Sequence, residues 1–322
     1  ENMMSSAPAA PPFSVRLVAG PPMQGEEDVV GDEAMLGVLW AMREYGFAVV
    51  RLSPVDCATV SSAIGVLSQA MREVHTHGIR TGQSGPIAPS LATWRERSQL
   101  RVKPEDAGRP LAVAAIAVAA EAAEESREER AEELEAVAAS ASAILSRVTQ
   151  AVLSALHHTR GTESTPTAGP RLLDTFYYPG EARWRTLCQN DQLPAPCPAH
   201  EDTGLLTAIC NDTNALQAQL HGRWVDIELE EDEVAIVAGR ALARLTRGRV
   251  PACMHRVCSV APSRTSLVFE VRPDEAALER IAAAEAALAA KPLGGEACVA
   301  ERYSKAAGAL LAIAPPSPCT FM

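Results

Sequence analysis

Between residues 171 and 273 the sequence is a series of short apolar runs separated by turn residues, and this pattern constrains the fold more than any other feature. In order, the runs are RLLDTFYYPG, GLLTAIC, ALQAQL, RWVDIEL, VAIVAG, MHRVCSVAP and RTSLVFEVRP. Short runs at even spacing, with turn residues between them, are typical of antiparallel strands in a sandwich or barrel. We therefore expect an antiparallel β core in residues 171–273.

Helical patterns flank this core. Apolar spacing and end signals predict helices at 32–46 and 53–75 with a short strand at 47–52 between them. Residues 76–110 predict a long loop with one short helix or strand at 91–102. Residues 111–160 contain neither Gly nor Pro and predict one long helix or a helical hairpin, whose charged middle is expected to be a solvated face.

The C-terminal residues return to a helical pattern. Residues 275–291 predict a helix, and a further helical or mixed stretch, EACVAERYSKAAGALLAI, precedes a Pro-rich tail. The fold class expected from all these elements is α+β.

The same elements predict one domain with an N-terminal arm. The arm is residues 1–31, which are rich in Pro and Ala, and the domain is 32–322. Within the domain we expect a mainly helical part at 32–160, the β core at 171–273, and C-terminal helices and a tail at 274–322.

Composition excludes several classes of partner. The chain has 322 residues, a formal net charge of −11 and a hydrophobic fraction of 47%. An acidic chain predicts no nucleic-acid partner, and no apolar run approaches the roughly 20 residues that span a bilayer. The start has no secretory signal pattern, and the eight cysteines form no C-x-x-C pair. We expect a cytoplasmic protein with free thiols, no membrane contact and an oligomeric state that the sequence leaves open.

Three residues of the β region carry a metal-ligand pattern. His200 and Asp202 are two apart, a spacing that on a strand puts both side chains on one face. His255 follows 53 residues after Asp202. Two imidazoles and one carboxylate form the facial triad of non-haem iron(II) oxygenases, which leaves open positions on the metal.

A second pair of residues follows the third ligand candidate. Arg264 and Ser266 are also two apart on an expected strand. A guanidinium fork with a hydroxyl beside it is a receptor for a carboxylate. A dicarboxylic co-substrate could chelate the metal at one end and bind here at the other.

At this point the sequence resembles the 2-oxoglutarate- and iron(II)-dependent dioxygenases, in the branch of isopenicillin N synthase and the plant small-molecule oxygenases. HEDTGLLTAIC resembles the H-x-D segment of that family, CMHRV its H-R-V segment and RTSLVFEVRP its R-x-S strand. LLDTFYYPG resembles its N-Y-Y-P strand, and AMREYGFAVVRL its first helix and strand. The resemblance covers about 32–75 and 145–310.

The resemblance implies a distorted double-stranded β-helix, or jelly roll, as the core. It implies that His200, Asp202 and His255 bind Fe(II), and that Arg264 and Ser266 bind the distal carboxylate of 2-oxoglutarate. Tyr178, the second tyrosine of the N-Y-Y-P match, is expected to add its hydroxyl. The implied reaction oxidises a small organic molecule, by hydroxylation or desaturation, with O₂ as oxidant, ascorbate as an optional reductant, and succinate and CO₂ as products.

Departures from the family pattern bear on the substrate. Phe176 stands where the family usually has Asn, and Arg240 where it usually has Asp. Glu270 lies on the expected inner face of the R-x-S strand, where relatives commonly have an aromatic residue against the substrate. Since an unpaired buried carboxylate is costly, either Arg183, Arg185 or Arg272 pairs with Glu270, or the substrate is cationic. Phe176 and Glu270 are therefore candidate substrate-binding residues.

Two other functions remain open from the sequence. One is an oxidase on the same fold that takes all its electrons from the substrate and needs no 2-oxoglutarate. The other is a non-catalytic binding protein that uses the 111–160 helix as its partner surface.

Overall fold

The structure, a computed structural model, describes residues 29–82, 85–88, 91–93, 97–102, 124–158, 168–180, 196–258 and 263–289. The helices are α1 (Val29–Tyr45), α2 (Pro54–Thr81), α4 (Glu124–His158), α6 (Arg240–Leu245) and α7 (Glu275–Ala289). The strands are β1 (Phe47–Arg51), β2 (Gly85–Ala88), β3 (Leu91–Thr93), β4 (Ser98–Val102), β5 (Ala168–Pro179), β6 (Cys197–His200), β7 (Leu206–Asn211), β8 (Leu216–Leu220), β9 (Arg223–Ile227), β10 (Glu233–Ala238), β11 (His255–Val257) and β12 (Ser263–Pro273).

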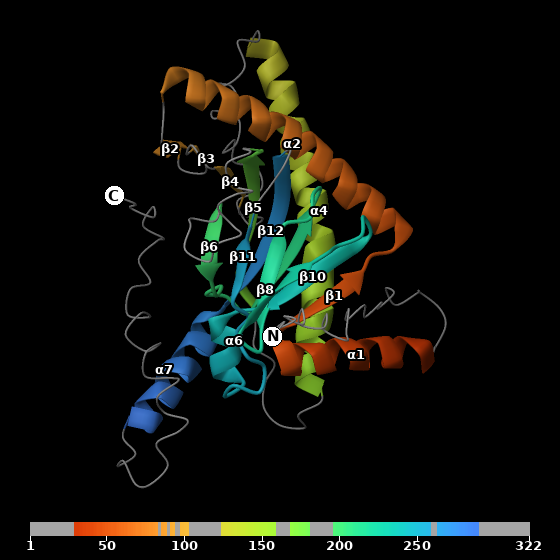
Figure 1. Ribbon diagram of the computed structural model, residues 1–322, viewed down its shortest axis with the longest axis vertical. Coiled ribbons are helices and arrows are strands. Elements are labelled where there is room, and N and C mark those ends of the chain that lie inside the picture. Colours follow the sequence, from red (N-terminus) through yellow and green to blue (C-terminus); the bar gives the residue numbers. More distant parts are fainter. Residues whose placement is uncertain are drawn as a thin grey trace, which may run out of the picture.

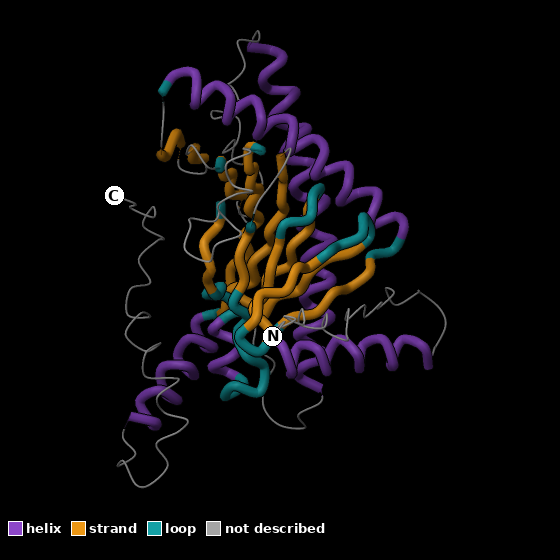
Figure 2. Tube along the Cα trace, viewed as in Figure 1, coloured by secondary structure: helices purple, strands orange, loops and turns teal. Residues whose placement is uncertain are grey.

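The strands form two antiparallel sheets. The larger has the order β1-β10-β7-β12-β5-β4-β3-β2 and the smaller β6-β11-β8-β9. One apolar cluster joins the two sheets, with Phe47 and Ile209 from the larger and Leu216, Ala218 and Ile227 from the smaller. The predicted antiparallel core and the α+β class are confirmed, and Figure 2 shows both sheets as one body of strands bordered by helices.

Two long helices cover the other face of the larger sheet. Figure 1 shows α4 running along the sheet and α2 crossing it, and both contact its strands. The odd-numbered residues of β12, such as Leu267 and Phe269, point to these helices and are fully buried with Leu145 of α4 and Leu67 of α2. Because side chains alternate along a strand, the even-numbered residues of β12 face the smaller sheet.

The residues before α2 explain why the helix begins at Pro54. The hydroxyl oxygen of Ser53 accepts a hydrogen bond from the backbone N–H of Asp56 at 3.1 Å, and Pro54 follows as the first helical residue. This is the N-cap and first-turn arrangement that the residues predict. The helix continues through Gly78 to Thr81, past the predicted end at 75, and Gly82 follows it with a left-handed backbone conformation, φ +69°.

The helix α4 contains a segment that resembles a membrane span by length and composition alone. Within the described residues, Glu132–His157 is long and apolar enough to cross a bilayer, with a mean hydropathy of 1.4, although no such segment was expected. Its apolar stripe, however, lies in the core. Leu134, Ile144, Leu153 and Leu156 are all buried against α2 and the sheet, as in the core helix of a globular domain.

The segment before α4 also differs from expectation. Residues 85–102 were expected to be a loop with one short element, but β2, β3 and β4 extend the larger sheet beyond β5. Strand β4 takes its place by pairing with β5, a non-local contact that local composition does not encode. Most of the predicted arm, the first part of the 111–160 helix and the last helical stretch lie outside the described residues.

Candidate metal centre

The fold brings the two histidines together across a strand pair. Strand β11 is antiparallel to β6, and His255 is the direct partner of His200 in the register. The two imidazole ring centres lie 4.4 Å apart. Residues that are distant in sequence therefore present their side chains side by side, as directly opposed residues on one sheet face do.

Asp202 lies beside the two histidines, but it is not on a strand as predicted. Strand β6 ends at His200, so Asp202 lies in the loop after it and not on the strand face that the two-residue spacing suggested. The loop is held instead by backbone hydrogen bonds. The N–H of Arg240, at the start of α6, donates to the carbonyl of Asp202 at 2.8 Å. Any residue except proline can make this backbone bond at 240, so the departure from the family pattern there leaves the loop intact.

Two glycines allow this loop and α6 to touch. A Cβ atom on Gly239 would lie 2.2 Å from the carbonyl oxygen of Gly204 and 3.1 Å from that of Asp202. No side chain fits at such a separation. Glycine at 239 is therefore a requirement for the position of Asp202.

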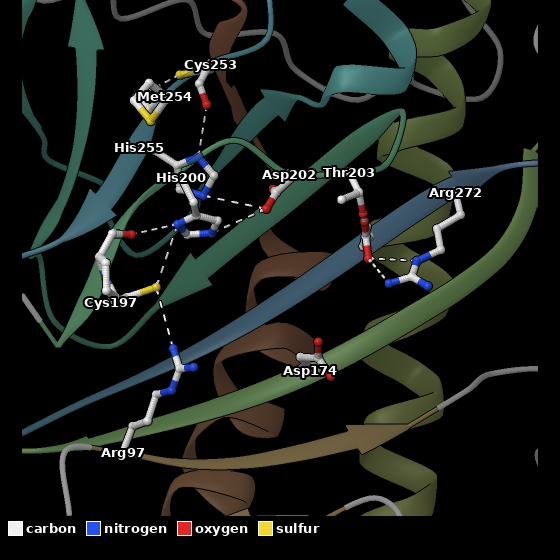
Figure 3. A network of polar contacts seen from close by, with 12 residues as sticks. Arg97, Asp174, Cys197, His200, Asp202, Thr203, Cys253, Met254, His255 and Arg272 are labelled. Carbon is white, nitrogen blue, oxygen red and sulfur yellow. Dashed lines mark hydrogen bonds and ion pairs between the residues drawn. The ribbon is translucent and has the colours of Figure 1, made fainter. Parts of the chain in front are cut away.

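The three side chains form a compact donor set. Oδ1 of Asp202 lies 3.5 Å from Nε2 of His200 and 3.9 Å from Nε2 of His255 (Figure 3). One possible ligand atom from each residue lies within 4.8 Å of the others. His255 and Asp202 are enclosed, with side chains 6% and 16% exposed, whereas that of His200 is 43% exposed. The centre thus opens on the His200 side.

Backbone carbonyls fix which nitrogen of each ring faces the centre. Nδ1 of His200 lies 2.8 Å from the carbonyl oxygen of Pro198, and Nδ1 of His255 lies 3.1 Å from that of Cys253. A carbonyl can only accept, so each Nδ1 carries the proton and donates it. The Nε2 lone pairs are then directed at Asp202 and at any cation between the three groups, as in protein metal sites.

The charges of the cluster are strongly coupled. Burial favours the neutral form of Asp202, but the contact with His200 and the charge of His255 outweigh it and lower the pKa of Asp202 to about 2. Burial also opposes the charged form of His200, yet Asp202 and Cys197 raise the pKa of that imidazole. For His255 burial prevails and lowers the pKa.

The donor chemistry fits a divalent transition metal. Oδ2 of Asp202 is buried and has no hydrogen-bond partner among the described residues, which is costly unless a cation or another donor meets it. Two imidazoles, which become neutral ligands when a metal ion replaces the Nε2 proton, and one ionised carboxylate also match the ligand set of non-haem iron(II). The residues present therefore fit the metal that the sequence predicts.

The predicted carboxylate receptor lies on the inner face of the larger sheet. Arg264 is 1% exposed and donates to the carbonyl of Thr213 at 2.9 Å, to Oδ1 of Asn211 at 3.1 Å and to the hydroxyl of Ser266. Every one of these acceptors is neutral, and no ion pair joins Arg264 to a carboxylate in the described part of the chain. Burial lowers the pKa of the guanidinium, which marks the cost of an enclosed cation. An anionic group at this place would remove that cost.

Tyr178 and Phe176 line the strand beside Arg264. Tyr178 is the direct cross-strand partner of Arg264, and its ring centre lies 5.6 Å from the guanidinium carbon. Burial raises the pKa of Tyr178, so its hydroxyl stays protonated. Phe176 stacks on Tyr178 at 6.2 Å between ring centres. Both lie on the same sheet face as Arg264 and Ser266.

Glu270 is not an unpaired carboxylate. Nε of Arg272 donates to its Oε2 at 3.0 Å, and the hydroxyl of Thr203 donates to its Oε1 at 3.1 Å. Of the three cations considered for it, Arg272 is the partner, while Arg183 and Arg185 lie outside the described residues. A cationic substrate was expected only if this buried carboxylate had no partner in the protein, and here it has two.

Sequence analysis missed two groups next to the centre. Cys197 lies with its sulfur 3.9 Å from Nδ1 of His200, and Arg97 approaches the same sulfur at 3.7 Å while lying 5.5 Å from the ring centre of Phe176. Burial alone would raise the pKa of Cys197, but His200 and Arg97 lower it. Cys197 was visible as a cysteine three residues before His200. Arg97 had no signal, because nothing in the short element expected at 91–102 indicates that it lies beside the β core.

Asn211 and Thr213, which accept from Arg264, were also missed. Asn211 is paired with Ser266 in the β7–β12 register. Only the pairing of these strands brings Asn211 to Arg264, so no local pattern could identify it.

Comparison with known sequences identifies the central part of the chain. Residues 173–273 match the sequence model of the 2OG-Fe(II) oxygenase superfamily, a range that contains all three metal-ligand candidates and Arg264. The chain is also 26% identical over 116 residues to the probable flavonol synthase 5 of Arabidopsis thaliana. That match spans 36% of this chain and 36% of the flavonol synthase, about a third of its length.

Solved structures share the fold at low sequence identity. A full-length Neurospora crassa protein crystallised with alpha-KG and 5-formyluracil superposes with a TM-score of 0.59 at 17% identity, covering 80% of this chain and 84% of that one. Dioxygenase for auxin oxidation 1 from Arabidopsis thaliana, as its 2-oxoglutarate complex, gives a TM-score of 0.53 at 18% identity, covering 80% and 93%. The predicted jelly-roll architecture is confirmed by these matches.

Proposed function

Because residues 173–273 match the sequence model of the 2OG-Fe(II) oxygenase superfamily, we propose that this chain is an Fe(II)- and 2-oxoglutarate-dependent dioxygenase. It oxidises a small organic molecule and releases succinate and CO₂. In this proposal His200, Asp202 and His255 are the protein ligands of the iron. We also propose that it acts in the cytoplasm, without a nucleic-acid or membrane partner.

In this proposal two groups of residues bind opposite ends of 2-oxoglutarate. Nε2 of each histidine and the carboxylate of Asp202 hold the metal, which supplies the means to activate O₂ when 2-oxoglutarate is bound. Arg264 and Ser266 bind the far carboxylate, with the protonated hydroxyl of Tyr178 beside them. Carbonyl hydrogen bonds at Nδ1 keep both imidazoles in the tautomer that binds metal.

One observation carries the proposal. Arg264 is fully buried, its acceptors are neutral, and it lies on the sheet face that looks towards the three metal-ligand candidates. A protein that needed only a metal would gain nothing from an enclosed cation at this place, whereas a dicarboxylate that chelates the metal requires one.

The substrate is proposed only as a small organic molecule. The similar proteins differ in this respect, since one is named for flavonol synthesis, one for auxin oxidation, and one was crystallised in complexes with thymine and with 5-formyluracil. Their folds and motifs do not select among these molecules. With Glu270 paired to Arg272, positive charge on the substrate has no support.

The test measures succinate formed by the full chain with Fe(II), 2-oxoglutarate and ascorbate. Three substrates are offered separately: a dihydroflavonol, indole-3-acetate and thymine. Succinate that rises with one of them, in step with its oxidised product, supports the proposal. Substrate oxidation that proceeds without 2-oxoglutarate identifies the oxidase alternative. An absence of iron-dependent O₂ uptake with every substrate favours the binding-protein alternative.

A further inference from the structure

The loop that presents Asp202 is clamped from two sides. On one side, the N–H of Arg240 donates to the carbonyl of Asp202 at 2.8 Å. On the other, the N–H of Leu205 donates to the carbonyl of Val271 at 2.7 Å, which ties the loop to the end of β12. The side chain of Asp202 faces His200 and His255, and its Oδ2 has no hydrogen-bond partner among the described residues, so its direction depends on how this loop is held.

Glu270 stands at the β12 side of this clamp. Its Oε1 accepts the hydroxyl of Thr203, the residue next to Asp202, at 3.1 Å. Its Oε2 accepts from Arg272, with both Nε and the terminal nitrogen at 3.0 Å. Figure 3 shows Thr203 and Arg272 near each other, on one side of Asp202. The chain Arg272–Glu270–Thr203 thus links β12 to the loop by side chains.

Backbone packing makes the contact tight. A Cβ atom on Gly204 would lie 2.7 Å from the carbonyl of Val271 and 2.9 Å from Oε1 of Glu270. The loop therefore rests directly on the Glu270 side chain over two consecutive residues, Thr203 and Gly204. Because Glu270 touches the loop directly, a change in its side chain should alter the position of Thr203 and Gly204.

The same contacts argue against the role first considered for Glu270. Its charge is balanced by Arg272, each oxygen already accepts a hydrogen bond, and its side chain is only 13% exposed. A substrate cation would have to displace Arg272, at the cost of leaving a half-buried guanidinium without its partner.

We propose that Glu270 is a positioning residue of the metal centre, which acts through Thr203 to hold the loop that carries Asp202. Arg272 orients the carboxylate of Glu270, and this carboxylate accepts a hydrogen bond from the Thr203 hydroxyl. That bond restricts the positions that the Asp202 loop can take. Groups behind metal ligands commonly change metal affinity by about 10–100-fold when they are removed. The inference deepens the proposed function, since it rests on Asp202 being a metal ligand.

The experiment measures Co(II) binding to the full chain, anaerobically and without substrate. Co(II) is chosen because its ligand-field absorption reports coordination geometry independently of turnover. Thr203→Val removes the hydroxyl at nearly constant volume, and Glu270→Gln removes the charge. We expect each to weaken Co(II) binding about tenfold and to alter the absorption spectrum, while Thr203→Ser restores both.

A double variant and a matched control complete the design. If Glu270 acts through Thr203, the Thr203→Val, Glu270→Gln protein should bind Co(II) no more weakly than the worse single variant, because the two residues form one chain. Asp56→Asn removes a carboxylate of similar exposure, 17%, from its pair with Arg147 on the helical layer. It should leave Co(II) affinity and spectrum unchanged even if Tm falls.

Two results would overturn the inference in distinguishable ways. If wild-type protein binds Co(II) and Thr203→Val binds it within twofold with the same spectrum, Glu270 does not position the centre, and the proposed function stands. If wild-type protein binds neither Co(II) nor Fe(II), the proposed ligand set fails, and the inference fails with it.

Discussion

The metal centre and the Arg264 cluster differ in how far their side chains are buried and in the charge that lacks a partner. At the metal centre one ligand candidate is 43% exposed and one carboxylate oxygen lacks a hydrogen-bond partner in the described residues. At the other end Arg264 and Ser266 are each 1% exposed, and the described hydrogen-bond acceptors of Arg264 are all neutral. The metal centre is therefore open to solvent and has an unpaired carboxylate oxygen that a cation could meet. The Arg264 end is enclosed and has a guanidinium that an anion could pair with.

In the proposed function, this difference reflects how the two ends share one co-substrate. A metal must be reached by substrate and O₂, so its ligands need an open side. The far end of a chelating dicarboxylate needs only a fixed anchor, which is strongest where water is excluded. Changes at the two ends should therefore separate into metal phenotypes and co-substrate phenotypes.

The largest effect is expected at the metal centre. His200→Ala, Asp202→Ala and His255→Ala should each abolish turnover and weaken Co(II) binding more than a hundredfold, since each removes one of three ligands. Equilibrium dialysis with Co(II) measures this directly. His77→Ala, on α2, is the control and should bind as wild type does. Full O₂ uptake by the His255→Ala protein would refute the triad.

The next effect should appear only at the closed end. Arg264→Gln leaves the far carboxylate of 2-oxoglutarate without its charge partner, so binding should weaken by about 2–4 kcal/mol. Anaerobic titration of 2-oxoglutarate into the Fe(II)-loaded protein measures it. The Co(II) affinity of Arg264→Gln without 2-oxoglutarate should stay within twofold of wild type. The control is Arg256→Lys, whose affinities for Co(II) and for 2-oxoglutarate should both stay within twofold of wild type. An unchanged 2-oxoglutarate affinity for Arg264→Gln would favour the oxidase alternative.

A smaller effect should reach the metal centre through the backbone. In Gly239→Ala the new methyl group meets the carbonyl of Gly204, so the Asp202 loop must shift. We expect a loss of about 1–3 kcal/mol in the free energy of unfolding, as for other overpacked sites, and weaker Co(II) binding. Gly65→Ala on α2 meets no atom within 4 Å and should instead stabilise the protein by about 0.5–1 kcal/mol. Denaturant unfolding would decide, and equal effects of the two changes would contradict the steric argument.

The smallest effect is expected between the two ends. Phe176→Leu removes the ring stacked on Tyr178 but no polar group, so stability should fall by about 0.5–1.5 kcal/mol. Co(II) and 2-oxoglutarate affinities should change less than threefold. If Phe176 contacts the substrate, KM for the accepted substrate should rise while both affinities stay constant. A large loss of 2-oxoglutarate affinity would instead make Phe176 part of the closed end.

Sequence alone determined the parts of the site that depend on residue type and local spacing. The alternation of apolar and turn residues over 171–273 predicted the antiparallel core, because side-chain period and turn chemistry act within a few residues. His200, Asp202 and His255 were identified as a donor set by their types, and Arg264 with Ser266 by their shared strand face.

Tertiary structure decided everything that depends on pairing between distant segments. The β6–β11 register sets His255 opposite His200, and α6 holds Asp202 in a loop where a strand face was predicted. The β7–β12 pairing supplies Asn211 to Arg264. Glu270 changed most, from a candidate substrate residue to the partner of Arg272 and Thr203. The reason is physical: local periodicity fixes which face a side chain takes, whereas its neighbours across that face are set by strand register and loop packing, which no local stretch encodes.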